Sequence, residues 1–129
     1  MWTLEVRTRE RVCFVDISRD VADLVRGAGD GAVVVFVPHT TAGVTINEDA
    51  DPSVRADLEM ALDRIVPDDL PFRHAEGNSD AHTKASLMGS SVTVPVVDGG
   101  LQLGTWQGVY FAEFDGPRRR RVLVSFLRA

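Results

Sequence analysis

The chain has 129 residues, a net charge of −5 and a single cysteine, so we expect one domain over residues 1–129 with no internal disulfide. No apolar stretch approaches the roughly 20 residues that span a bilayer, and no signal-peptide pattern opens the sequence. The acidic balance argues against a nucleic-acid partner. These features predict a cytoplasmic protein without a membrane or nucleic-acid partner.

The N-terminal half begins with alternating apolar and polar residues at 4–8 and 12–16, which predict a hairpin that turns around residues 9–11. Ser18 offers a cap for a helix that the glycines from Gly27 onward end. The β-branched run 32–37 is typical of a strand buried on both faces, and residues 44–47 predict another short strand.

The second half opens on a strong helix start, with Asp51 as the cap and Pro52 at the first helical position. An irregular segment follows, and Asp80 is placed to cap a short helix that ends at Gly89. Three further strands are predicted over 91–96, 104–113 and 122–127. Turns at 98–100 and 115–117 predict hairpins between them.

The predicted elements include two or three helices, and they do not alternate as repeated βαβ units. This order predicts an α+β fold whose curved sheet is mixed or largely antiparallel.

Rare residue types gather in two short windows. All three histidines, both asparagines and the only lysine fall within 39–47 and 74–84. The first window leaves the end of a predicted buried strand, where loops commonly carry function. We therefore expect the two windows to form one working site.

The histidines His39, His74 and His82 admit three interpretations. Neutral imidazoles are common ligands of zinc-like metals, so together they predict a divalent metal site, with zinc or magnesium as the ion. They could instead hydrogen-bond within loops, or act directly on an anionic substrate. The spacing of His74 and His82 matches no known metal motif.

Other polar residues of the windows are candidates for chemistry or for binding. Glu48 and Glu76 could act as a general base or support a ligand, although most of the 19 acidic residues must lie on the surface. Lys84 is expected near a helix N-terminus that attracts anions, as a phosphate contact or a tunable amine. The remaining candidates are substrate-binding hydroxyls and amides, namely Thr40, Thr41, Asn47 and Asn78.

A third patch, Gly104 to Glu113, places glycines around Trp106 and Gln107. Trp106 is either an aromatic wall of the site or a core or interface residue. Glu113 lies within an apolar strand, where a charge needs a partner, so it belongs to a site or an interface. The arginine run 118–121 is either a solvated turn and strand start, an anion site or a subunit contact.

The strings HTTAGVTINEDADP, RHAEGN and LGTWQGVYFAEFDGPR, in this order, closely resemble the YjbQ family, also called secondary thiamine-phosphate synthase enzymes. The resemblance spans nearly the whole chain.

The resemblance implies an α+β fold with a closed mixed barrel, a homotrimer, and a polar pocket that holds a divalent metal. It implies an enzyme, a transferase that joins a thiazole phosphate to a pyrimidine diphosphate. A metal-dependent hydrolase, or a binding module without efficient catalysis, is the alternative. In this interpretation Glu48, Glu76, His82 and Lys84 are catalytic, and the three histidines bind the metal. Substrate contacts come from Thr40, Thr41, Asn47, Asn78, Trp106, Gln107 and Glu113.

Overall fold

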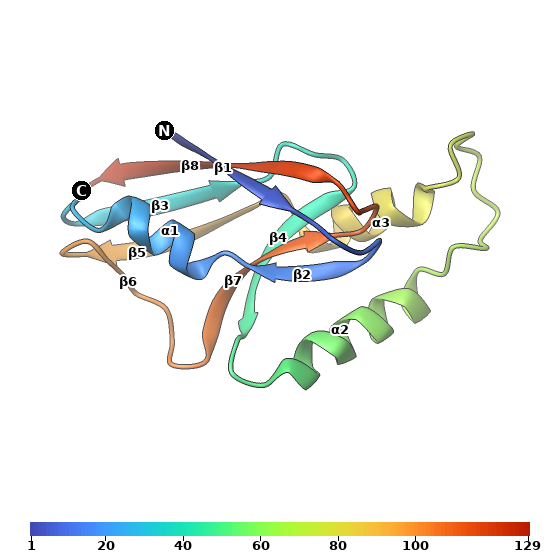
Figure 1. The fold of residues 1–129 in the computed structure, drawn as a ribbon, viewed down its shortest axis with the longest axis horizontal. Helices are drawn as coiled ribbons and strands as arrows, with labels where there is room; N and C mark the ends of the chain where they lie inside the picture. The colour runs from blue at the N-terminus through green and yellow to red at the C-terminus, as the bar shows by residue number, and fades with distance from the viewer.

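Eight strands and three helices make up the computed structural model, which describes all residues 1–129. In chain order the elements are β1 (Trp2–Arg7), β2 (Cys13–Asp16), α1 (Ser18–Val25), β3 (Gly31–Phe36), β4 (Ala42–Glu48), α2 (Pro52–Ile65), α3 (Ser79–Met88), β5 (Ser91–Val97), β6 (Gly100–Leu101), β7 (Gln107–Glu113) and β8 (Arg119–Arg128) (Figure 1). The predicted α+β class is confirmed.

The strands form two curled sheets in which every pair is antiparallel. The first sheet has the order β1-β8-β3-β5-β6, and the second has the order β2-β7-β4. Alternate side chains of both sheets meet in the main core, where valines such as Val35, Val44 and Val124 are almost fully buried. α1 closes this core with Val21 and Val25. The β-branched residues therefore form strands because one face of each sheet is removed from water.

β7 is buried on both faces, unlike most strands of the molecule. Val109 and Phe111 belong to the main core, while Tyr110 and Ala112 face a second apolar cluster. That cluster includes Ala81 and Ala85 of α3 and lies on the opposite side of the three-stranded sheet. α3 is thereby fixed against β4 and β7, which decides where its polar residues lie.

Two hairpins predicted from turn residues are wrong, and a third has a different partner. β1 pairs with β8 while β2 pairs with β7, so the first two strands enter different sheets. β7 and β8 are also in different sheets despite the turn between them. The turn at Asp98 and Gly99 does form a hairpin, but its second strand is the two-residue β6. A turn fixes a change of direction, whereas pairing depends on distant strands.

The predicted burial of residues 32–37 on both faces is also wrong. Val33 and Val35 are fully buried, whereas Phe36 is 41% exposed. One face of β3 packs on the main core, and the other face is only partly covered.

Helix caps agree with the sequence at α2 and differ at α1 and α3. Asp51 caps α2, accepting a hydrogen bond from the Ser53 amide. Ser18 is the first residue of α1, and its Oγ accepts from the Val109 amide of β7. Asp80 does not cap α3, because its carboxylate is turned inward and bound by Arg11.

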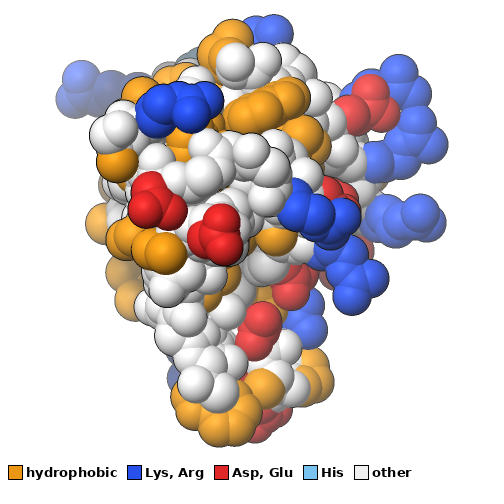
Figure 2. Space-filling view, turned by 90° about the vertical axis from the view of Figure 1, so that its left-hand side faces the viewer, with side chains coloured by type: hydrophobic (Ala, Val, Ile, Leu, Met, Phe, Trp, Pro, Cys, Tyr) orange, Lys and Arg blue, Asp and Glu red, His pale blue; other side chains and the backbone are white.

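Acidic, basic and apolar side chains are interspersed on the end of the molecule shown in Figure 2, with a group of apolar side chains at its lower tip. No helix combines the length and the apolar character that crossing a membrane requires.

Candidate functional site

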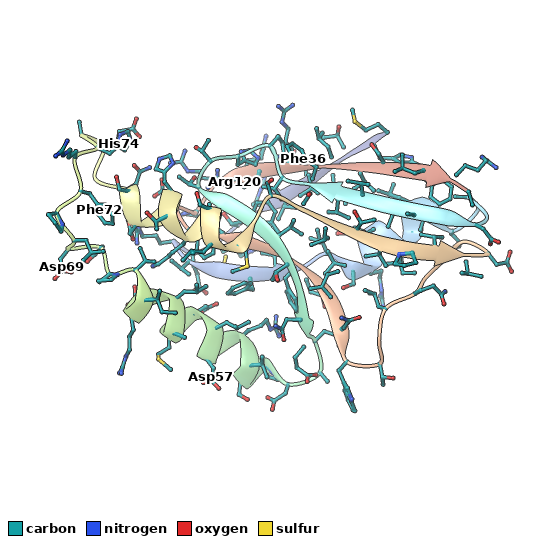
Figure 3. All side chains as sticks on the ribbon, turned by 180° about the vertical axis from the view of Figure 1, so that it is seen from behind. Phe36, Asp57, Asp69, Phe72, His74 and Arg120 are labelled. Atoms are coloured by element: carbon teal, nitrogen blue, oxygen red, sulfur yellow. The ribbon has the colours of Figure 1, made fainter.

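A pocket of about 630 Å³ lies where the end of β3, the start of α3 and the start of β8 meet. Its polar lining residues are His39, Thr40, Thr41, His74, Glu76, Asn78, His82, Ser90, Arg118 and Arg120. In Figure 3, His74 lies at the outer end of α3 and Arg120 lies toward the sheets. The structure therefore brings together the start of the first polar window and most of the second, whereas Asn47 and Lys84 lie elsewhere.

Gly43 allows this convergence. A Cβ atom at Gly43 would lie 2.5 Å from the backbone oxygen of Gly89, at the end of α3. The same oxygen accepts a hydrogen bond of 3.1 Å from the Val44 amide. The glycine thus lets the end of α3 approach β4 closely, which holds His82 near the segment that carries Thr40 and Thr41.

His39 is held in a defined orientation at the edge of the five-stranded sheet. Its Nε2 atom accepts a hydrogen bond of 3.1 Å from the backbone amide of Arg121. Burial, followed by the positive charge of Arg120, lowers the pKa of His39 below its ordinary value. His39 is therefore neutral near pH 7, with its proton on Nδ1.

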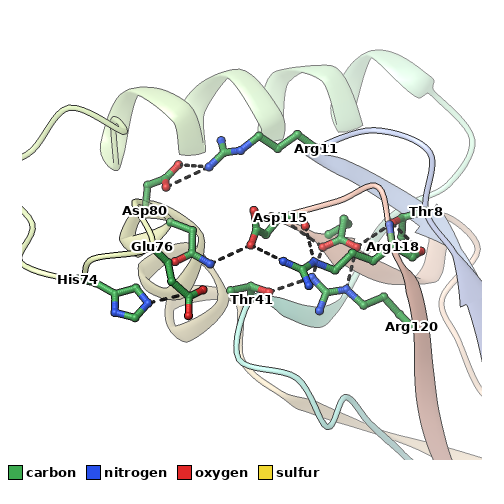
Figure 4. A network of polar contacts seen from close by, with 11 residues as sticks. Thr8, Arg11, Thr41, His74, Glu76, Asp80, Asp115, Arg118 and Arg120 are labelled. Carbon is green, nitrogen blue, oxygen red and sulfur yellow. Dashed lines mark hydrogen bonds and ion pairs between the residues drawn. The ribbon is translucent and has the colours of Figure 1, made fainter.

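His74 and His82 meet edge to face, with ring centroids 5.3 Å apart. His74 Nε2 also lies 4.0 Å from Glu76 Oε2 (Figure 4). His74 and Glu76 belong to the irregular segment before α3, and both are exposed. The pair of rings forms the outer wall of the pocket.

These residues do not complete a metal site within one chain. No group of three His, Cys, Asp or Glu side chains is close enough to hold an ion. His39 Nε2 is already used as an acceptor, which leaves only Nδ1 for any ligand. The divalent metal stays a prediction of the sequence.

The base of the pocket is a buried ion pair between Glu113 of β7 and Arg120 of β8. Arg120 Nε donates to Glu113 Oε1 at 2.8 Å, and Arg120 Nη2 contacts Glu113 Oε2. Arg120 Nη2 also donates to Thr41 Oγ1 at 2.9 Å, and the Thr8 hydroxyl donates to Glu113 at 2.7 Å (Figure 4). Glu113 has the buried partner that its position in the sequence required.

A second polar chain fixes the wall nearest α3. Asn78 Nδ2 donates to Asp115 Oδ2 at 2.9 Å, and Arg118 Nη2 donates to the same oxygen at 3.0 Å. Asn78 Oδ1 is buried and has no hydrogen-bond partner. This chain ties the start of α3 to the turn before β8.

The two carboxylates make the stability of the site sensitive to acid. Burial raises the pKa of Glu113, but hydrogen bonds from Arg120, Thr8 and the Asp115 amide outweigh burial, so its pKa lies below the ordinary 4.5. The pKa of Asp115 is lowered in the same way, because hydrogen bonds from Asn78 and Arg118 outweigh burial. Both groups bind fewer protons in the folded state than in the unfolded state.

We therefore expect the stabilisation from these carboxylates to be fully present above pH 4.5 and to be lost as the pH falls through the folded pKa values. Urea unfolding between pH 7 and pH 3 measures this. The Glu113→Gln variant should show a shallower loss of stability over the same range. A variant whose acid dependence equals that of the parent would contradict the assignment.

Four candidates of the sequence lie far from the pocket. Ala42, beside the pocket, and Glu48 lie at opposite ends of β4, about 20 Å apart along the strand. Glu48 pairs there with Gln107 of β7. The side chains of Asn47, Glu48 and Gln107 make only local bonds to nearby backbone amides. Trp106 precedes β7 and is 64% exposed, so it forms no wall of this pocket.

Lys84 also lies outside the pocket. Its side chain is 1% exposed, and Nζ lies 3.4 Å from Asp63 of α2 and 3.9 Å from Asp80. It faces the space between α3 and α2, in the second turn of its helix rather than at the N-terminus. No phosphate could reach it there without displacing these partners.

Arg118 and Arg120 line the pocket, although the sequence pattern singles out neither of them. From the pattern alone, the arginine run 118–121 is a solvated turn and strand start, an anion site or a subunit contact. Alternation along β8 turns Arg120 inward and leaves Arg119 and Arg121 exposed. The need of Glu113 for a cation was the signal that could have identified Arg120.

The fold and the site define a small α+β protein with a polar pocket rich in imidazole and guanidinium groups. The sequence model of the UPF0047 protein YjbQ-like family matches residues 2–129. The chain is similar to the UPF0047 protein YugU of Bacillus subtilis, with 45% identity over 97% of each chain. A UPF0047 protein of Archaeoglobus fulgidus is 44% identical, over 96% of this chain and 98% of its own length. The chain belongs to the YjbQ (UPF0047) family.

Solved structures agree with this assignment. An uncharacterized conserved protein of this family from Clostridium acetobutylicum superimposes with a TM-score of 0.96 and 49% identity, covering 98% of this chain and 100% of the other. A conserved hypothetical protein from Thermus thermophilus gives a TM-score of 0.93 and 46% identity, with coverage of 98% and 100%. The fold is therefore that of the family.

Proposed function

We propose that this protein is a cytoplasmic enzyme that acts on a small phosphorylated metabolite in the histidine pocket. The reaction we favour joins a thiazole phosphate to a pyrimidine diphosphate and gives thiamine phosphate. The observation that carries the proposal is the convergence of three imidazoles and two guanidinium groups on one pocket.

The size and charge of the pocket support a small anionic substrate. Its volume of about 630 Å³ is in the range of pockets that enclose metabolites. Arg118 and Arg120 present guanidinium groups to the pocket, although each is held by a carboxylate behind the lining, and Glu76 is the only acidic residue of the lining itself. Thr40, Thr41 and Ser90 add hydroxyl donors, which suit phosphate oxygens.

The favoured reaction is a displacement at carbon. The lone pair of the thiazole nitrogen forms a bond to the methylene carbon of the pyrimidine, and the bond from that carbon to the diphosphate oxygen breaks. Diphosphate leaves with the electron pair, and the thiazole becomes a thiazolium cation. The step needs fixed positive charge and donors where negative charge grows on the leaving oxygen.

The residues of this chain could meet that need. Arg120 is preorganised because Glu113 and Thr41 hold its guanidinium. The neutral His39 can donate from Nδ1, since Nε2 is already an acceptor. His82 lines the pocket from helix α3, and we assign it the role of a donor to the leaving oxygen. His74 lies on the more exposed segment that precedes α3.

We expect His82→Asn to lower kcat for thiamine phosphate formation by about 100- to 1000-fold, the usual cost of removing one donor at a developing charge. Diphosphate release from both precursors, followed against time, measures this. Thr83→Ala is the matched control, because its hydroxyl bonds only to the Ser79 carbonyl of its own helix. Its kcat should stay within about twofold of the parent, as for a surface substitution.

Turnover that His82→Asn leaves unchanged would overturn the site. Failure of the parent protein to form thiamine phosphate would overturn the reaction. Phosphate-ester hydrolysis that a chelator abolishes would then favour the metal-dependent hydrolase, and tight binding without turnover would favour the binding module. The same preparation tests the proposed homotrimer by sedimentation, since a trimer should have three times the chain mass of 14.1 kDa.

A further inference from the structure

A second cavity lies beside the histidine pocket and shares two of its walls, His39 and Arg120. It has a volume of about 530 Å³, and none of its lining residues is hydrophobic. The other residues around it are Thr3 and Glu5 of β1, and Arg119 and Arg121 of β8. Two exposed guanidinium groups, those of Arg119 and Arg121, thus face one carboxylate in a protein whose net charge is −5, because the guanidinium of Arg120 is bound by Glu113.

The strand geometry of β8 produces this basic cavity. Arg119 and Arg121 project from the exposed face of the strand, about 6.6 Å apart along it. The buried Arg120 between them turns inward to Glu113, and the backbone amide of Arg121 binds His39 Nε2. His39 is thereby fixed between the two cavities.

The two exposed guanidinium groups at this cavity, those of Arg119 and Arg121, have few partners within the protein. Arg121 makes no ion pair and no hydrogen bond through its side chain, whereas Arg119 contacts only Glu5, at 3.5 Å. Both members of that pair are more than half exposed, so its contribution to stability is small. These side chains can therefore turn to a ligand at little cost.

We propose that this cavity binds the diphosphate group of a ligand whose remaining part occupies the histidine pocket. The inference rests on the proposed function, because it assigns the diphosphate end of the substrate to a place of its own. Planar guanidinium groups bind phosphate oxygens two at a time, and two of them on one strand face suit two linked phosphates. A compact anion also fits the charge of the molecule, because the acidic remainder of the chain repels a long polyanion such as nucleic acid.

Calorimetric titration with inorganic diphosphate tests the cavity without any turnover. We expect Arg121→Gln and Arg119→Gln to weaken diphosphate binding by about 10- to 100-fold each, as expected for a charge-assisted hydrogen bond. Glu5→Gln should strengthen binding, because it removes the only carboxylate of the cavity. Inorganic phosphate should bind more weakly than diphosphate to the parent protein, since it engages one arginine at a time.

One control variant removes the same charge elsewhere. Arg128→Gln changes an exposed arginine at the far end of β8. It should bind diphosphate within about twofold of the parent, because exposed charges at a distance are screened by salt. Arg118→Gln removes a guanidinium of the histidine pocket and shows whether free diphosphate binds there instead. All the altered arginines are exposed, so each variant should fold, and its melting temperature verifies this.

Four results would overturn the proposal. They are the absence of diphosphate binding by the parent, equal weakening by Arg128→Gln, weakening by Arg118→Gln but not by Arg121→Gln, and a changed oligomeric state of Arg121→Gln. The last would identify this face as a contact between copies of the chain. Diphosphate binding that depends on Arg121 in a protein that makes no thiamine phosphate would support the cavity while rejecting the proposed reaction.

Discussion

Replacing Glu113 with alanine is expected to lower the free energy of unfolding by about 3–5 kcal/mol, the cost of leaving a buried charge without its partner. Glu113 is fully buried and Arg120 is 5% exposed, so the guanidinium would be left largely out of water without its carboxylate. The Thr8 hydroxyl would also lose the nearer of its two acceptors and keep only the Arg118 carbonyl, at 3.1 Å. Urea unfolding at pH 7, monitored by circular dichroism, measures the change.

Two further variants separate the charge from the packing. The double change Glu113→Leu with Arg120→Met removes both charges and should recover most of the stability, because the pair is replaced by apolar groups. Glu5→Ala removes an exposed glutamate and should change stability by less than about 1 kcal/mol. A Glu113→Ala variant as stable as Glu5→Ala would show that the ion pair does not hold the base of the pocket.

The second large effect concerns Lys84. We expect Lys84→Ala to lower the free energy of unfolding by about 3 kcal/mol, because its buried ammonium is the partner of Asp80 and Asp63. Arg11 continues to bind both carboxylate oxygens of Asp80 in this variant. The expected loss of stability is therefore at the lower end of the range for breaking a buried ion pair. The kcat of the folded fraction should stay close to that of the parent protein, because Lys84 does not line the pocket.

Lys84→Met is the matched variant, since it keeps an apolar chain of similar length and removes only the charge. It should lose less stability than Lys84→Ala, because the packing of the stem is retained. Denaturant unfolding and single-turnover assays on the same samples measure both properties. If Lys84→Ala kept the stability of the parent but lost turnover, the structural role would be wrong and Lys84 would be a catalytic residue.

The candidate site was predictable where its polar residues lie close together along the chain. His39 with Thr40 and Thr41, and His74 with Asn78 and His82, belong to two windows that the structure brings to one pocket. These residues were identifiable because rare residue types gathered there. Asn47 ends the first window and Glu48 follows it directly, but both lie at the far end of β4. A strand of seven residues separates its ends by about 20 Å, which closeness in sequence does not reveal.

The composition and the apolar pattern determined the α+β class, most of the strands and the start of α2 at Asp51 and Pro52. These features depend on local preferences that each segment carries by itself. The sequence also determined the two polar windows from which most of the pocket is built, and the need of Glu113 for a partner.

Only the tertiary structure decided which strands pair and where each polar side chain lies. Arg120 finds Glu113 because β7 and β8 enter different sheets and meet at the base of the pocket. Lys84 is turned away from the pocket because Asp80 and Asp63 enclose it between α3 and α2. Both outcomes follow from the cost of burying a charge without a partner, and that cost is settled by contacts between residues far apart in the chain.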